Sequence, residues 1–121
     1  MKRILVFIFA CALTMFLYTP AYAEDVWAYR TQEYGNEADV YVQSETCNKV
    51  LEHDHWVYSA KIKYVRGGRL ISRCSVEFAK MGYNVYDYRI IREKSNGRWQ
   101  RIHINDPFMN TLKVIKQYTG E

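Results

Sequence analysis

The sequence is poor in the residues that build metal centres. Its 121 residues include three cysteines and three histidines. No two cysteines form a C-x-x-C pair, and the histidines lack the spacing of a zinc site, so we expect neither a metal nor another cofactor. The one candidate is the pair His53 and His55, whose imidazoles could meet one cation from a strand edge, with His103 joining from elsewhere. The alternative is a solvated loop without a ligand.

A catalytic constellation is also missing. Ser72 and Ser75 lie in an alternating strand pattern, with no strained turn that would present a nucleophile. Glu77 and Asp87 are expected to face solvent, where neither would acquire the shifted pKa that acid catalysis needs. The sequence therefore predicts a protein that is not an enzyme.

Charge of one sign is not in large excess. The chain carries 17 basic and 13 acidic residues; removal of residues 1–23 costs two bases and no acids, so the net charge falls from +4 to +2. That balance does not indicate a nucleic-acid partner. The distribution is uneven, with eight acids against two bases in residues 24–60 and five acids against thirteen bases in residues 61–121. The surface could therefore be dipolar.

Only one long apolar run is present, and it lies at the amino terminus. Lys2 and Arg3 precede an apolar stretch over residues 4–17, shorter than the roughly twenty residues of a membrane-spanning helix. Ala21-Tyr22-Ala23 then supplies the small side chains that signal peptidase needs. We expect residues 1–23 to be a signal peptide cleaved after Ala23, with no transmembrane span left; an uncleaved anchor is the alternative.

Cleavage would send residues 24–121 to the periplasm, the outer surface or the medium. A second route stays open, because Ile8-Phe9-Ala10-Cys11 loosely resembles a lipobox in which Cys11 would be lipidated. Cys47 and Cys74 remain as an even pair in an oxidising compartment. We expect them to form a disulfide that disfavours the unfolded chain by about 3–4 kcal/mol. Two buried thiols are the alternative.

Repeats, low-complexity tracts and linkers are lacking too, so residues 24–121 are expected to form one domain. Asp25–Thr31 and Asp39–Gln43 have the composition of strands, with a break at Gly35-Asn36. Ser44–Asp54 is polar and lacks a clear period. We expect it to be a connection with one helical turn.

Two longer segments, His55–Val65 and Arg69–Ala79, alternate between apolar and polar residues and predict a hairpin. A two-residue Gly-Gly turn would mix the two faces, whereas a three-residue loop at Arg66-Gly67-Gly68 pairs like with like, for example Ala60 with Cys74. The longer loop is therefore expected. The side chains predicted to point inward are Trp56, Tyr58, Ala60, Ile62, Tyr64, Leu70, Ser72, Cys74, Val76 and Phe78.

A second hairpin is predicted from Asn84–Arg92 and Arg98–Ile104. A three-residue loop at Ser95-Asn96-Gly97, with Gly97 in the left-handed conformation, gives this hairpin one apolar face. That face holds Tyr86, Tyr88, Ile90, Ile102 and Ile104. The Met81-Gly82-Tyr83 turn joins both hairpins into a four-stranded meander.

The apolar face needs a cover, and the last residues predict one. Asp106 is a helix cap, Pro107–Tyr118 is the expected helix, and Gly120 ends it. Phe108, Leu112 and Ile115 recur at helical spacing. The predicted fold class is α+β, an antiparallel sheet of about six strands in a meander with a carboxy-terminal helix packed on one face.

The same registers turn a basic set to the opposite face. Lys61 is expected directly across from Arg73, and the face also carries apolar residues such as Val57 and Ile91. Such a surface suits an acidic partner. The alternatives are a solvated face balanced by acids or a face covered by the first strand. The candidate binding residues are Lys61, Lys63, Arg73, Arg89, Arg101 and Trp99.

The order of elements resembles that of a known family. Val40-Tyr41-Val42 early in the chain, a long Gly-turned hairpin, and Gly97-Arg98-Trp99 leading through Asp106-Pro107 into a final helix look like the surface-adhesin E-like family of small exported bacterial proteins. The resemblance implies an envelope location and, for its name-giving adhesins, attachment to host surface molecules. It carries over no functional residue, and Ser44-Glu45-Thr46-Cys47 stands where the family often has an aspartate-serine connection.

Two functions are consistent with these features. The first is a non-catalytic envelope or surface binding module, adhesin-like, whose basic sheet face meets an unknown protein or an anionic glycan. The alternative is a small periplasmic inhibitor or accessory subunit that blocks an envelope enzyme with Ser44–Asp54. Nine tyrosines and three tryptophans remain after processing, and some could form a homodimer seam.

Overall fold

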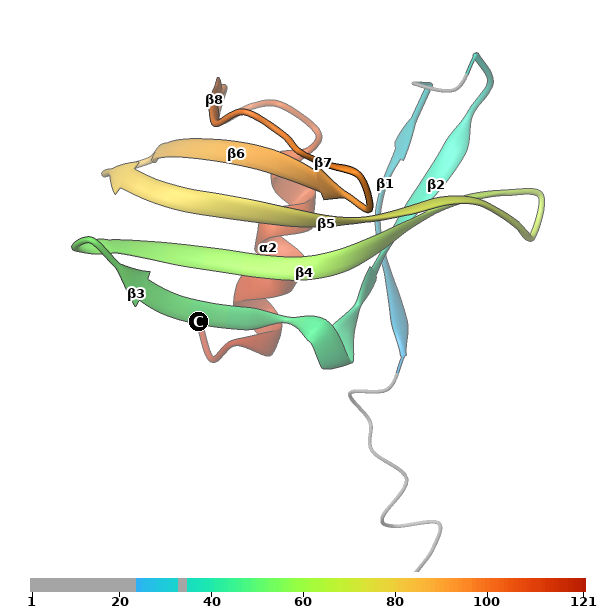
Figure 1. The fold of residues 1–121 in the computed structure, drawn as a ribbon. Helices are drawn as coiled ribbons and strands as arrows, with labels where there is room; N and C mark the ends of the chain where they lie inside the picture. Colours follow the sequence, from blue (N-terminus) through green and yellow to red (C-terminus); the bar gives the residue numbers. More distant parts are fainter. Residues whose placement is uncertain (1–23, 33–34) are drawn as a thin grey trace, which may run out of the picture.

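The computed structural model describes residues 24–32 and 35–121, which are coloured in Figure 1. The expected signal peptide, its cleavage site and Cys11 lie outside the described residues. Within them, eight antiparallel strands form an open sheet with one α-helix behind it, so the predicted α+β class is confirmed. The elements are β1 (Asp25–Thr31), β2 (Ala38–Gln43), the 3-10 turn η1 (Ser44–Thr46), β3 (Asn48–Glu52), β4 (His55–Arg66), β5 (Arg69–Gly82), β6 (Val85–Arg92), β7 (Ser95–Asn96), β8 (Gln100–Ile102) and α2 (Met109–Tyr118).

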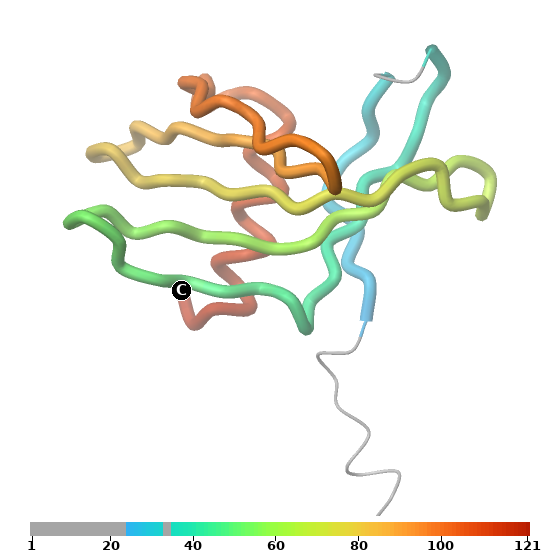
Figure 2. The backbone as a smooth tube through the Cα atoms, in the orientation of Figure 1, coloured from blue at the N-terminus to red at the C-terminus, as the bar shows by residue number. Residues whose placement is uncertain are grey.

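The strands form a meander in the order β1-β2-β4-β5-β6-β7, with β8 beside β7 on the edge of β6. Two strands share one edge of β4, since β2 pairs with its residues 62–65 and β3 with its residues 55–59. Between them η1 interrupts the edge, and the Thr46 hydroxyl accepts a hydrogen bond from the Lys61 backbone N–H at 2.8 Å. Figure 2 shows this interruption as the bend between β2 and β3. The Lys61 N–H therefore has a hydrogen-bond acceptor although no described strand pairs with Lys61 on that edge of β4.

The polar segment Ser44–Asp54 is more regular than the sequence predicts. Its single helical turn is confirmed as η1, but the residues after it form β3 and not a loop. A two-residue turn follows in which His53 and Asp54 have φ of 47° and 68°. The alternating pattern was missing because β3 is an edge strand exposed along most of its length, so neither face selects apolar residues.

The β4–β5 register differs from the expected one by two residues. The chain turns through Gly67-Gly68 alone, with φ of 55° and 78°, so Arg66 pairs with Arg69. A bulge between Tyr64 and Val65 then shifts the register, so that Ala60 faces Val76 and not Cys74. The bulge restores the alternation that a two-residue turn would otherwise spoil, and the predicted faces are therefore right although the pairs are wrong.

The second hairpin also turns at a different place. Ile91 pairs with Asn96 and Arg92 with Ser95, so the turn is Glu93-Lys94 and not Ser95-Asn96-Gly97. Gly97 is not in the left-handed region; its N–H donates to the Ile90 carbonyl at 2.8 Å, and a Cβ there would lie 2.4 Å from that oxygen. Glycine is thus required for close backbone approach. Ile104, predicted to be buried, is 43% exposed beyond the end of β8.

The core lies between the sheet and α2, as the alternating pattern predicts. Tyr58 and Val76 are 1% and 0% exposed, and half-buried Ile90 packs against the core. Trp56 and Leu70, at the strand ends, are instead exposed. From the helical segment, the buried side chains are Phe108, Met109, Thr111, Leu112 and Ile115. The face of the sheet away from α2 is called the outer face below.

The helix starts two residues later than predicted, at Met109, because residues 106–108 form a tighter turn. The Asp106 carboxylate accepts a hydrogen bond from the Phe108 N–H at 2.9 Å and so caps this turn. Gly120, with φ of 91°, ends the helix as expected. Within residues 24–32 and 35–121, no helix is both long enough and apolar enough to cross a membrane.

Candidate functional site

The outer face carries all five predicted basic residues, but three of them are neutralised within the sheet. Lys63 forms an ion pair with Asp25 at 2.9 Å. Arg89 contacts Glu77 on the neighbouring strand, and Arg101 contacts Asp87, each at 2.5 Å. These three pairs stabilise strand registers and leave less free positive charge than the composition suggests.

Arg89 has a second partner, Trp99. The guanidinium lies 4.6 Å from the centre of the indole ring, within the range of a cation–π contact. Trp99 is 41% exposed all the same. The predicted binding residue Arg89 therefore contacts both Trp99 and Glu77.

The remaining two cations, Lys61 and Arg73, are exposed and are not directly opposite each other as predicted. Lys61 pairs with Ser75, and Arg73 pairs with Lys63, so the two cations are diagonal neighbours on one face. Diagonal Cβ atoms lie about 7–8 Å apart. Among residues 24–32 and 35–121, neither side chain has a carboxylate within the 4.0 Å of an ion pair.

Lys61 and Arg73 line a shallow cavity of about 590 Å³, called the basic hollow here. Hydroxyl and amide groups complete its lining, together with Arg92 and two carboxylates at the rim. Glu45 is one of these carboxylates, and it already accepts a hydrogen bond from the Gln43 amide at 3.4 Å. The lining residues are Gln43, Glu45, Thr46, Lys61, Arg73, Cys74, Ser75, Ile91, Arg92 and Glu93.

A second cavity of about 320 Å³, the apolar groove, lies at the other end of the same face. Its floor is Val57 and Ala79, which pair with each other and are 4% and 7% exposed. Met81 and Trp99, both 41% exposed, also line it. This burial on the outer face was not predicted, because simple alternation assigns these positions to solvent.

The metal candidates His53 and His55 lie on the rim of the apolar groove, with Glu52. His103 is placed elsewhere, where its Nδ1 accepts a hydrogen bond from the Asn105 N–H at 3.1 Å. In the described part of the chain, no three His, Cys, Asp or Glu side chains gather closely enough to hold a metal ion. Two histidines at one rim do not make a metal centre.

The expected disulfide does not form: Cys47 and Cys74 are both thiols. Cys47 precedes β3 and Cys74 lies on β5, with β4 between those strands. Neighbouring strands are about 4.8 Å apart, so strands flanking a third are about 10 Å apart, beyond the roughly 7 Å that a disulfide spans. Burial, and secondarily the Glu45 carboxylate, raise the pKa of Cys47 to about 11.

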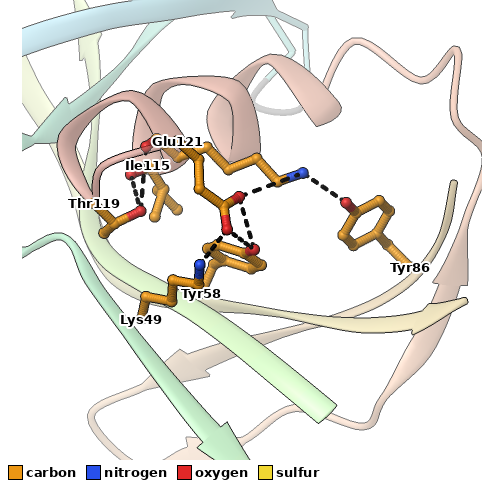
Figure 3. A network of polar contacts seen from close by, with 7 residues as sticks. Lys49, Tyr58, Tyr86, Ile115, Thr119 and Glu121 are labelled. Atoms are coloured by element: carbon orange, nitrogen blue, oxygen red, sulfur yellow. Dashed lines mark hydrogen bonds and ion pairs between the residues drawn. The ribbon is translucent and has the colours of Figure 1, made fainter. Parts of the chain in front are cut away.

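A polar network that the sequence did not indicate joins the end of α2 to the inner face (Figure 3). The Tyr58 hydroxyl contacts both carboxylate oxygens of Glu121 at 2.8 Å, and Lys49 forms an ion pair with the same carboxylate. Lys116 donates to the Tyr86 hydroxyl at 2.6 Å, and its ammonium lies 5.4 Å from the centre of the Tyr58 ring. Helix and three strands are thus fastened together.

This network, called the clamp below, holds its side chains in the protonation states that its contacts need. Burial, followed by the hydrogen bond to Glu121, raises the pKa of Tyr58, so its proton stays in place. Hydrogen bonds from Lys49 and Tyr58 lower the pKa of Glu121, which keeps that carboxylate ionised. Both shifts stabilise the protonation states that the contacts require. We interpret the network as structural.

Comparison with family models, curated proteins and solved structures finds no match to this chain. The resemblance to the surface-adhesin E-like family therefore stays a prediction from the order of elements.

Proposed function

We propose that this protein is a non-catalytic, exported binding module that recognises an acidic group through the basic hollow. The observation that carries the proposal is the pair Lys61 and Arg73, two neighbouring cations without a carboxylate partner in the described part of the chain. The other three candidate cations each have such a partner. The anion-binding face is accordingly narrower than the sequence predicts.

The lining of the hollow is chemically suited to a carboxylate, sulfate or phosphate. Arg73 offers a planar fork for two parallel hydrogen bonds, and Lys61 offers a mobile point charge. Ser75 and the second N–H of the Gln43 amide add neutral donors beside them, whereas the Thr46 hydroxyl already donates to the Gln43 carbonyl at 2.7 Å. Two carboxylates, Glu45 and Glu93, line the same hollow as Lys61 and Arg73, so selectivity depends on where the ligand places its charge.

The cellular setting of the proposal comes from the signal-like residues 1–23. After cleavage the module would work in the periplasm, on the outer surface or in the medium, where an acidic partner could be a protein or an anionic glycan. An adhesin-like role agrees with this setting. The inhibitor alternative has less support, since the segment assigned to block an enzyme is η1 and an edge strand.

The test is retention on a sulfated-polysaccharide matrix eluted with salt. Lys61→Glu and Arg73→Glu should each elute at clearly lower salt than the parent protein, because each places an anion in the hollow. Lys113→Glu is the matched control, with the same charge change on the exposed side of α2. Thermal unfolding midpoints of all three should stay close to the parent value, since the replaced side chains are exposed. Equal retention of the three variants would remove the proposal.

A further inference from the structure

The basic hollow and the apolar groove lie in line along the outer face. Between them is a third cavity of about 280 Å³, which shares Thr46, Lys61, Ser75 and Ile91 with the basic hollow and adds Ser59 and Glu77. Val57 and Ala79, the groove floor, are the next outward residues of β4 and β5. The three cavities thus follow the β4–β5 pair as a trough.

The trough changes character along its length. One end is apolar, with a buried floor and the exposed side chains of Met81 and Trp99. The middle is lined by hydroxyls together with Ala60, Ile91 and the Glu77 carboxylate, which is paired with Arg89. The other end carries Lys61 and Arg73. A ligand complementary to the whole path needs an apolar group, a polar middle and an acidic group, in that order.

We infer that the partner is an extended polypeptide segment that places an apolar side chain in the groove and an acidic side chain over Lys61 and Arg73. This inference rests on the proposed function and names its partner class. A groove of about 320 Å³ holds one leucine or phenylalanine side chain, and its floor of Val57 and Ala79 offers no hydrogen-bond partner to a sugar hydroxyl. The groove is also lined by polar residues, of which Asp87 and Arg89 are already held in ion pairs: Glu52, His53, His55, Asp87 and Arg89. The floor therefore favours an apolar side chain over a sugar ring.

The structure also fixes the spacing of the two anchors. From Val57 to Lys61 the strand advances four residues, which is about 13 Å at 3.3 Å per residue. An extended peptide covers the same length in four residues. The apolar and the first acidic residue of the partner should therefore be separated by three residues, in one chain direction or the other.

The experiment measures fluorescence anisotropy with labelled ten-residue peptides on a serine background. The probe carries one leucine, three serines and two consecutive glutamates, and is made in both chain orders. Its comparison peptides replace leucine with serine, remove the three-serine spacer, or replace both glutamates with glutamine. We expect the leucine to raise affinity about tenfold at the predicted spacing only, as burial of one such side chain allows.

Protein variants locate the effect. Met81→Glu should abolish the gain from leucine and keep the dependence on glutamate. Tyr83→Glu makes the same charge change at a side chain that is 90% exposed in the turn after β5, and it should keep both. A glutamate dependence without any gain from leucine, or tight binding of a heparin-derived hexasaccharide that Met81→Glu leaves unchanged, would overturn the inference and leave the proposed function standing. Loss of the glutamate dependence would also overturn the inference, and the proposed function would fall with it only if the Lys61 and Arg73 variants were retained on the sulfated matrix like the Lys113 control.

Discussion

Replacing Gly97 with alanine tests the backbone geometry that sets the β6 edge. The added Cβ would lie 2.4 Å from the Ile90 carbonyl oxygen and 3.1 Å from the Ile90 nitrogen, whereas real contacts to a Cβ are essentially never under 3.0 Å. The two backbones must separate by at least 0.6 Å, the difference between 3.0 and 2.4 Å. Such overpacking costs about 1–3 kcal/mol. Weakening the Gly97 N–H bond to Ile90 adds about 0.5–1.5 kcal/mol, so we expect a loss of about 2–4 kcal/mol.

The assay is urea and thermal unfolding followed by circular dichroism. For a domain of this size, the expected loss lowers the unfolding midpoint by about 10–25 °C. Gly82→Ala is the matched control, because its nearest neighbour would be an ordinary 3.7 Å from the new Cβ, and its stability should change by less than about 1 kcal/mol. Gly97→Asn separates close approach from a left-handed turn: asparagine tolerates a left-handed turn but would clash here like alanine. Equal stability of the Gly97 and Gly82 variants would show that the chain at Gly97 accommodates a Cβ without strain.

Three further predictions concern the clamp and the thiols. Because the pKa of Glu121 is lowered in the folded protein, its contacts with Lys49 and Tyr58 contribute their full stability above the unfolded pKa of about 4.3, and this stability is lost as the pH falls through the lower folded value. Urea unfolding should therefore show Glu121→Gln to be less stable than the parent at pH 7, with a difference in unfolding free energy that shrinks toward pH 3. A difference that stays constant with pH would contradict this. Because its pKa is raised to about 11, Cys47 should react with iodoacetamide at pH 8 about 100-fold more slowly than an ordinary thiol. Mass spectrometry after alkylation in denaturant without reductant should find Cys47 and Cys74 both labelled. An unlabelled protein with a mass two hydrogens below that of the reduced chain would show that the disulfide forms.

Alternation along the strands predicted the faces of the sheet but not its registers. Burial requires every second residue of β4 and β5 to point toward α2, and this requirement is written in the sequence. The register depends on where a bulge inserts one extra residue into a strand, and the hydrophobic pattern gives no signal for the bulge after Tyr64. A two-residue turn at Gly67-Gly68 would mix the two faces of an unbulged hairpin, and the bulge after Tyr64 prevents that mixing.

The free and paired cations of the site are harder to predict than the fold, because a charged side chain forms ion pairs with residues on neighbouring strands. Whether Arg89 is free or paired depends on its being opposite Glu77, which only the register decides. The clamp was invisible for a similar reason, since Glu121 meets Tyr58 and Lys49 across sequence separations of 63 and 72. Residue type and local spacing carry no signal for such contacts.

An NMR titration of the isotope-labelled protein with the leucine–glutamate peptide shows whether acidic ligands bind over Lys61 and Arg73, because it records which backbone amides change chemical shift. We expect the largest changes at the outward residues of β4 and β5, including Ser75. Changes concentrated on α2 around Lys113, or spread over every exposed basic residue alike, would contradict this expectation.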